Sequence, residues 1–195
     1  MKNIVFDLGG VLFARDKSKC TPELLEFFSF LRAPRMPLFW EEYDRGTSTL
    51  AEVTAAISEM TGRSCETCAA VLRLAVDLQE PVRPTERLVG DLKAAGYKLY
   101  VLSNMSREFI AFLRRFPVYR LFDGEVVSCE EGTVKPEPRI YEILLERYGL
   151  DPAETLFIDD RAANIAAAEG LGIAGYLFDH RNPAAACDEL RRRLL

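Results

Sequence analysis

The sequence has few of the residues that several common kinds of active site require. Its only histidine is His180, in the polar segment Asp179–Pro183, which is typical of a surface loop. Catalysis by a histidine-activated nucleophile is therefore not expected. The cysteines number five, an odd count that favours reduced thiols, and the pair Cys65 and Cys68 has no second pair to complete a zinc site. Both are expected to be ordinary helix residues.

Long apolar runs and an excess of positive charge are also missing. No apolar stretch is long enough to span a bilayer, and the N-terminus starts with a strand-like segment instead of a signal peptide. The net charge of -5 opposes binding to nucleic acid or to an anionic membrane. We therefore expect a cytoplasmic protein without nucleic-acid or membrane partners. An anionic small substrate is still compatible, because a metal or a lysine can set the local field. The oligomeric state stays open.

The segment Asn3–Leu12 organises the chain. The apolar residues 4–6 predict a buried strand, and a single carboxylate, Asp7, follows it. Gly9 and Gly10 then permit a tight turn and a close approach of a ligand to the backbone. A charge at the end of a buried strand usually serves a metal, a partner or a reaction. Taken alone, the motif also fits a strand that simply ends in Asp before a turn.

Residues 13–82 show helical patterns and no strong strand signal. The expected helices are one after Thr21 that Pro34 and Pro37 stop, one over residues 38–45, one after Thr47 or Ser48 that stops at Gly62, and one after Ser64. They would form a helical unit inserted after the first strand.

From residue 84 onward, helices and strands alternate. Strands are expected at residues 98–102, 125–128, 155–158 and 174–178, with helices at 85–95, 107–116, 138–148, 162–171 and 183–195. Such alternation predicts an α/β fold with a parallel sheet and right-handed crossovers. We therefore predict a Rossmann-like core from residues 1–14 and 83–195, with a helical cap at 15–82.

Polar residues follow three of the predicted strands: Asp7, the pair Ser103-Asn104, and the pair Asp159-Asp160. Because the carboxyl ends of parallel strands meet at one edge of a sheet, we expect these groups to converge there. The adjacent carboxylates of the last pair repel each other, and a cation would relieve this repulsion. Carboxylates without His or Cys ligands suit Mg²⁺. Taken singly, the last two pairs could instead cap the helices that follow them.

Lys135 is a further candidate for the same site. Pro136 restricts Lys135 to extended backbone geometry, which could hold its side chain toward the carboxylates. The alternative is an ordinary solvated lysine.

Together these segments resemble the ordered motifs of the haloacid dehalogenase-like (HAD-like) hydrolases, and the resemblance extends over essentially the whole chain. The segments are Phe6–Leu12, Leu102–Asn104, Lys135–Tyr141 and Phe157–Asn164. The helical insertion is similar to the family's C1 cap. The Asp-Leu-Gly-Gly form, with Ser-Asn and Asp-Asp in later motifs, resembles the bacterial α-glucose-1-phosphate phosphatase-like branch. The phosphatase domain of soluble epoxide hydrolase is a more distant relative.

The resemblance implies a Mg²⁺-dependent phosphatase for a small phosphorylated metabolite, such as a sugar phosphate. Asp7 would be the nucleophile and form an aspartyl-phosphate. The resemblance also implies that Mg²⁺ would be held by Asp7, the backbone carbonyl of Gly9 and Asp160, with Asp159 binding through a water. The alternative that Asp159 binds directly and Asp160 through a water stays open. Phosphoryl oxygens would be bound by Ser103 and Asn104 beside Gly10, their charge offset by Lys135, and Asn164 would position the last loop.

One position departs from the family pattern. HAD-like hydrolases usually carry a second Asp, the general acid and base, two residues after the nucleophile, where this chain has Gly9. A replacement donor could come from the cap, where Glu41, Glu42 and Asp44 are candidates.

The cap would also select the substrate. Trp40 and Arg45 on the cap, and Arg107 after the second motif, are candidate substrate contacts. The alternative for Trp40 is packing inside the cap. Two other functions stay open: a binding or regulatory member of the fold that has lost catalysis, and a phosphotransferase that returns the phosphoryl group to its substrate.

Overall fold

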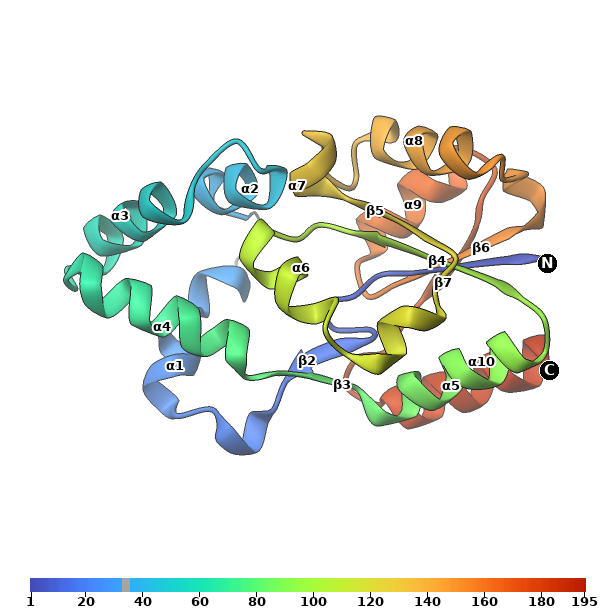
Figure 1. The fold of residues 1–195 in the computed structure, drawn as a ribbon, viewed down its shortest axis with the longest axis horizontal. Helices are drawn as coiled ribbons and strands as arrows, with labels where there is room; N and C mark the ends of the chain where they lie inside the picture. Colours follow the sequence, from blue (N-terminus) through green and yellow to red (C-terminus); the bar gives the residue numbers. More distant parts are fainter. Residues whose placement is uncertain (33–35) are drawn as a thin grey trace.

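The computed structural model describes residues 1–32 and 36–195, and its centre is a five-stranded parallel sheet. The strand order is β5 (Gly124–Val127), β4 (Lys98–Ser103), β1 (Asn3–Phe6), β6 (Thr155–Asp159) and β7 (Ala174–Leu177). β1 lies in the middle, with Phe6 opposite Val101 on one side and Ile158 on the other. The predicted α/β fold with a parallel sheet is confirmed, and the carboxyl ends of all five strands point toward the cap (Figure 1).

Helices cover both faces of the sheet (Figure 1). One face carries α5 (Arg83–Ala94) and α10 (Pro183–Leu194), and the other carries α8 (Pro138–Tyr148) and α9 (Ala162–Glu169). Alternate residues of the central strand divide between two apolar clusters, with Ile4 and Phe6 in one and Val5 in the other. A strand buried on both faces explains the unbroken apolar run at the start of the chain.

Several predicted boundaries move by a few residues. β4 includes Ser103 and β6 includes Asp159, so each strand extends one residue further toward the site. The strand predicted at 125–128 ends at Val127, because the chain turns there into the short helix α7 (Ser128–Glu131). The helix predicted at 107–116 is α6 (Arg107–Leu113), followed by a 3-10 turn at Pro117–Leu121.

The inserted unit contains α1 (Pro22–Phe27), α2 (Leu38–Arg45), α3 (Leu50–Thr61) and α4 (Cys65–Asp77) around its own apolar cluster. α3 is capped by Thr49, not by Thr47 or Ser48, because Thr49 and Glu52 form a reciprocal capping box. α1 ends at Phe27, before the predicted breaker Pro34, which lies outside the described residues. The five cysteines are free, with Cys65 and Cys68 in the first turn of α4.

A two-stranded antiparallel ribbon joins the two units, contrary to the expectation that residues 13–82 contain no strand. β2 (Phe13–Arg15) pairs with β3 (Gln79–Pro81), and Phe13 lies opposite Pro81. Each strand has only three residues. The predicted cap boundary between residues 14 and 15 falls within β2, and the one between residues 82 and 83 falls just after β3. Within the described parts of the chain, no helix is long and apolar enough to span a membrane.

Candidate active site

Asp7 is the first residue after β1, and neighbouring strands fix it in place. Its backbone N–H donates to the carbonyl of Ile158 at 2.9 Å, which continues the sheet pairing by one residue. Its side chain is buried, and Oδ1 accepts a hydrogen bond from the hydroxyl of Ser103 at 2.7 Å. Lys135 Nζ lies 2.9 Å from the same oxygen. The three predicted residues from three separate motifs are therefore in direct contact.

Lys135 is buried at the centre of the site and is not a solvated charge. Its ammonium group lies 2.6 Å from Asp159 Oδ2 and donates to the carbonyl of Leu102 at 2.9 Å. Its backbone is held by Asn104, whose Oδ1 accepts from the N–H of Lys135 at 2.7 Å and whose Nδ2 donates to its carbonyl at 2.9 Å. The Asn104 amide thus positions the lysine, and its contact with phosphate stays a prediction.

Asp159 and Asp160 are adjacent in sequence but have different environments. Asp159 is fully buried, and its oxygens accept from the backbone of Arg161 at 2.7 Å and from Asn164 Nδ2 at 3.1 and 3.0 Å. Asn164 therefore positions the loop after β6, in the role proposed for it. Asp160 keeps some exposure, and its Oδ2 lies 3.3 Å from His180 Nδ1. The sequence reading of His180 as a plain surface residue missed this contact.

The electrostatics of the site favour a bound cation. Burial raises the pKa of Asp7 to about 6, Lys135 opposes the shift, and Asp159 and Asp160 add to it. Burial also raises the pKa of Asp160, and the charge of Asp159 reinforces this. Burial disfavours the charge of Lys135, but Asp159 and Asp7 outweigh it and raise the lysine pKa. The single ammonium group of Lys135 is therefore present for three closely spaced carboxylates.

The donor set fits Mg²⁺. Asp7, Asp159 and Asp160 each offer a carboxylate oxygen, and these oxygens lie within 4.8 Å of one another. Hard oxygen donors with space for waters and a phosphate are the usual magnesium environment. Since Lys135 and Asn164 engage Asp159, Asp160 is the better placed of the pair to bind a cation directly.

Comparisons with known proteins agree with this geometry. The family model for haloacid dehalogenase-like hydrolases matches residues 1–172. This chain belongs to that family. It is 30% identical over 193 residues to a sesquiterpene phosphatase of Aspergillus oryzae, covering 98% of this chain and 95% of the relative. It is 27% identical over 189 residues to a D-ribitol-5-phosphate phosphatase of Bacteroides thetaiotaomicron, covering 88% of this chain and 89% of that protein.

A solved HAD family enzyme from Bacteroides thetaiotaomicron, in complex with magnesium and inorganic phosphate, has the same fold. The TM-score is 0.70 with 29% sequence identity, over 92% of this chain and 95% of that one. The family prediction is confirmed, and the chain is a hydrolase.

In the cap of this HAD-like hydrolase, the two residues predicted to contact substrate have partners within the protein. Trp40 is buried in the cap cluster against Phe28, Phe30 and Tyr43, which favours the packing alternative. Arg45 bonds Glu137 through both terminal nitrogens, at 2.9 and 2.6 Å, and also pairs with Glu41.

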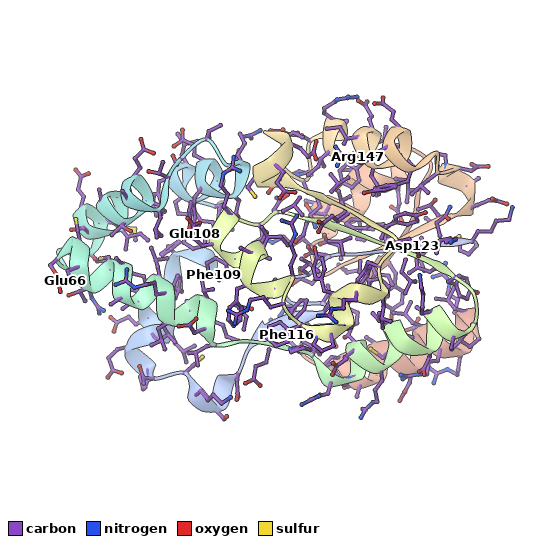
Figure 2. All side chains as sticks on the ribbon, viewed as in Figure 1. Glu66, Glu108, Phe109, Phe116, Asp123 and Arg147 are labelled. Atoms are coloured by element: carbon purple, nitrogen blue, oxygen red, sulfur yellow. The ribbon has the colours of Figure 1, made fainter. Side chains whose placement is uncertain are left out.

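Arg45 and Glu137 thereby join α2 to the residue before α8, across the boundary between cap and core. A second cap–core contact runs from Tyr43 on α2 to α6, where Tyr43 donates to Glu108 Oε2 at 2.6 Å. Figure 2 labels Glu108 and Phe109 on α6 beside the cap helices, and Phe109 is part of the cap's apolar cluster.

Proposed function

We propose that this hydrolase is a Mg²⁺-dependent phosphatase that hydrolyses a small phosphorylated metabolite, such as a sugar phosphate, through an aspartyl-phosphate on Asp7. The observation that carries the proposal is the setting of Asp7. Its carboxylate is buried between Ser103 and Lys135, at the edge of the sheet where two further carboxylates converge. A merely structural aspartate would not need two more carboxylates next to it, one of them fully buried.

The residues of the site divide the work of phosphoryl transfer. Asp7 attacks phosphorus, Ser103 orients the attacking carboxylate through its hydroxyl, and Lys135 offsets the charge on the nucleophile and the transferring group. Asp159 and Asn104 keep Lys135 in position. When bound by Asp7, Asp160 and the backbone of Gly9, Mg²⁺ would screen the carboxylate from the phosphate and polarise the phosphoryl oxygens. The exposed backbone at Gly9 is open to such a ligand.

The proposed substrate class is based on the names of two relatives. One is named for a sugar-alcohol phosphate and another for a sesquiterpene, so both act on small molecules but of different polarity. We further propose a cytoplasmic enzyme without nucleic-acid or membrane partners, on the basis of the net charge of -5.

The test is phosphate release from a panel of sugar phosphates, prenyl phosphates and other phosphorylated metabolites, with and without Mg²⁺, beside the variant Asp7→Asn. Mg²⁺-dependent release that the variant lacks, with an unchanged circular dichroism spectrum, supports the proposal. If no compound of a wide panel is hydrolysed, the rival function as a binding or regulatory protein replaces it. Transfer of the phosphoryl group to a second position of the substrate, without free phosphate, would identify a phosphotransferase instead.

A further inference from the structure

Gly9 leaves the proposed phosphatase without the general acid and base that HAD-like hydrolases usually carry at this position. The position itself is open: Gly9 is exposed, and among the described residues other than its chain neighbours only the Met105 methyl, at 3.9 Å, lies within 4 Å of where a Cβ would be. A donor on another element could therefore reach the same region. Unaided departure of an alkoxide from phosphorus is slow, and a positioned acid typically contributes about 10²- to 10⁴-fold.

Helix α2 of the cap is fastened, through Ser128 of α7, to the loop that begins at Asn104 just after β4. The hydroxyl of Ser128 donates to the backbone carbonyl of Asp44 and accepts from the N–H of Met105, at 2.9 Å in the second case. At the end of α2, Gly46 lies so close to α7 that a Cβ there would be 2.3 Å from the carbonyl oxygen of Cys129. The backbone of Asp44 is thus fixed against the catalytic edge of the sheet.

The Asp44 carboxyl lies among the charges of the site. It is influenced by the neighbouring Trp40 side chain and interacts electrostatically with Arg161, Asp7 and Lys135. These residues come from three different segments at the carboxyl edge of the sheet, so the Asp44 side chain lies within electrostatic range of that edge. Asp44 also keeps some exposed surface, unlike the fully buried Asp159. Asp44 is therefore not sealed off from solvent.

The surroundings of Asp44 also favour a proton on its carboxyl. Burial raises its pKa to about 7, Arg161 opposes this shift, and Asp7 adds to it. The two other cap candidates are placed differently. Glu41 pairs with Arg45 at 2.8 Å, and Glu42 precedes Asp44 by two positions, so the two side chains leave the helix in different directions.

We propose that Asp44 is the general acid and base of this enzyme, supplied by the cap in place of the carboxylate that Gly9 lacks. The proposal rests on the phosphatase function proposed above. In the first step, Asp7 bonds to phosphorus, the bond from phosphorus to the substrate oxygen breaks, and Asp44 gives its proton to that oxygen. In the second step, Asp44 takes a proton from the water that attacks phosphorus. The bond from phosphorus to Asp7 then breaks, which releases phosphate and restores both side chains.

The experiment uses p-nitrophenyl phosphate, whose leaving group needs no proton, with Asp44→Asn, Asp44→Glu and Glu42→Gln. Asn keeps the size and polarity of Asp44 but cannot give up or take a proton. We expect Asp44→Asn to release p-nitrophenol in a rapid stoichiometric burst and then turn over about 10²- to 10⁴-fold more slowly. The enzyme should accumulate a phosphoryl adduct on Asp7, detected by mass spectrometry. Asp44→Glu should recover part of the turnover, and Glu42→Gln should behave as wild type.

The outcomes separate the two proposals. If Asp44→Asn turns over as fast as wild type and forms no adduct, the proposed role of Asp44 is overturned. The proposed phosphatase function is then unaffected. The role of Asp44 is also overturned if Asp44→Asn gives neither burst nor adduct, because Asp44 would then be needed before Asp7 attacks phosphorus. The same adduct in His180→Gln instead of Asp44→Asn would assign the role to His180. Absence of Mg²⁺-dependent hydrolysis in the wild type, for this probe and the whole panel, removes the phosphatase function itself.

Discussion

Gly10 leaves free the space that the Asp160 carboxylate occupies. A Cβ on Gly10 would lie 2.6 Å from Asp160 Oδ2, and the backbone of Gly10 has a φ of +80°. Two requirements therefore meet at one residue: a left-handed backbone that closes the turn after β1, and an open path for the carboxylate that is best placed to bind a cation.

Gly10→Ala should separate these two requirements. Gly62 has a φ of +69°, and no atom of the described residues beyond its chain neighbours lies within 4 Å of the Cβ position. Gly62→Ala therefore reports the backbone cost alone, about 1–2 kcal/mol. We expect Gly10→Ala to cost a similar amount, because the end of the Asp160 side chain can move aside. It should also abolish the stabilisation by Mg²⁺, which Gly62→Ala retains. Thermal unfolding with and without Mg²⁺ measures both, and equal Mg²⁺ responses would contradict the prediction.

Lys135→Met should strongly destabilise the fold. The substitution removes the one ammonium between Asp7 and Asp159 and leaves their buried carboxylates without the positive charge that pairs with them. Loss of one member of a buried ion pair typically costs about 3–5 kcal/mol. Chemical denaturation measures the change, and excess Mg²⁺ should recover part of it. Lys2→Met is the control, since that lysine pairs with Glu154 at the exposed surface, and it should leave the unfolding midpoint unchanged.

Mg²⁺ should stabilise the wild-type protein, and the two adjacent aspartates should respond differently to substitution. At a hundredfold excess over its Kd, a ligand adds about 2.7 kcal/mol, or roughly 5–10 °C in Tm for a domain of this size. Asp160→Asn should lose this gain yet unfold no more easily than wild type without metal, because it removes a carboxylate whose charge is disfavoured. Asp159→Asn should destabilise the metal-free protein, since Lys135 loses a partner at 2.6 Å. The reverse pattern would make Asp159 the direct ligand.

The Arg45–Glu137 pair should make the stability contributed by the cap–core contact depend on pH. Arg45 is the main cause that lowers the pKa of Glu137 from 4.5 to about 2. A lowered pKa stabilises the fold above the unfolded value and loses this effect as pH falls through the folded value. The difference in unfolding free energy between wild type and Arg45→Met should thus be largest near pH 6, on the order of 1 kcal/mol after solvent screening, and shrink toward pH 3. A difference that is constant with pH would exclude the ion pair as its source.

The sequence predicts most of the core and the convergence of the site, because both follow from local patterns. Apolar runs of strand length, each ending in a polar residue, need only the rule that parallel strands share a carboxyl edge. Asp7, Ser103 and Lys135 meet as expected for this reason. The same rule could have located His180: it follows β7, which pairs with β6, so its loop reaches the same edge as Asp160.

The rest depends on partners far apart in the chain or on very weak local signals. Arg45 and Glu137 are 92 positions apart, and no local pattern links them. The ribbon of β2 and β3 has three residues in each strand, and its Pro81 argues against a strand. An asparagine at position 104 is typical of a helix cap or a phosphate ligand. Only the fold shows that both its polar side-chain atoms hold the backbone of Lys135.

The short ribbon has a consequence for the evolution of such an enzyme. Phe13 lies opposite Pro81, and the N–H of Val82 donates to the carbonyl of Leu12 at 2.8 Å, so the chain leaves and re-enters the sheet unit at neighbouring points. An insertion whose ends meet can be replaced without changing the strand order. If α2 supplies the proton donor and the cap selects the substrate, as proposed, such a replacement would remove both functions together, while the proposed nucleophile Asp7 stays in the core. The two halves of the reaction would then be inherited as separate parts.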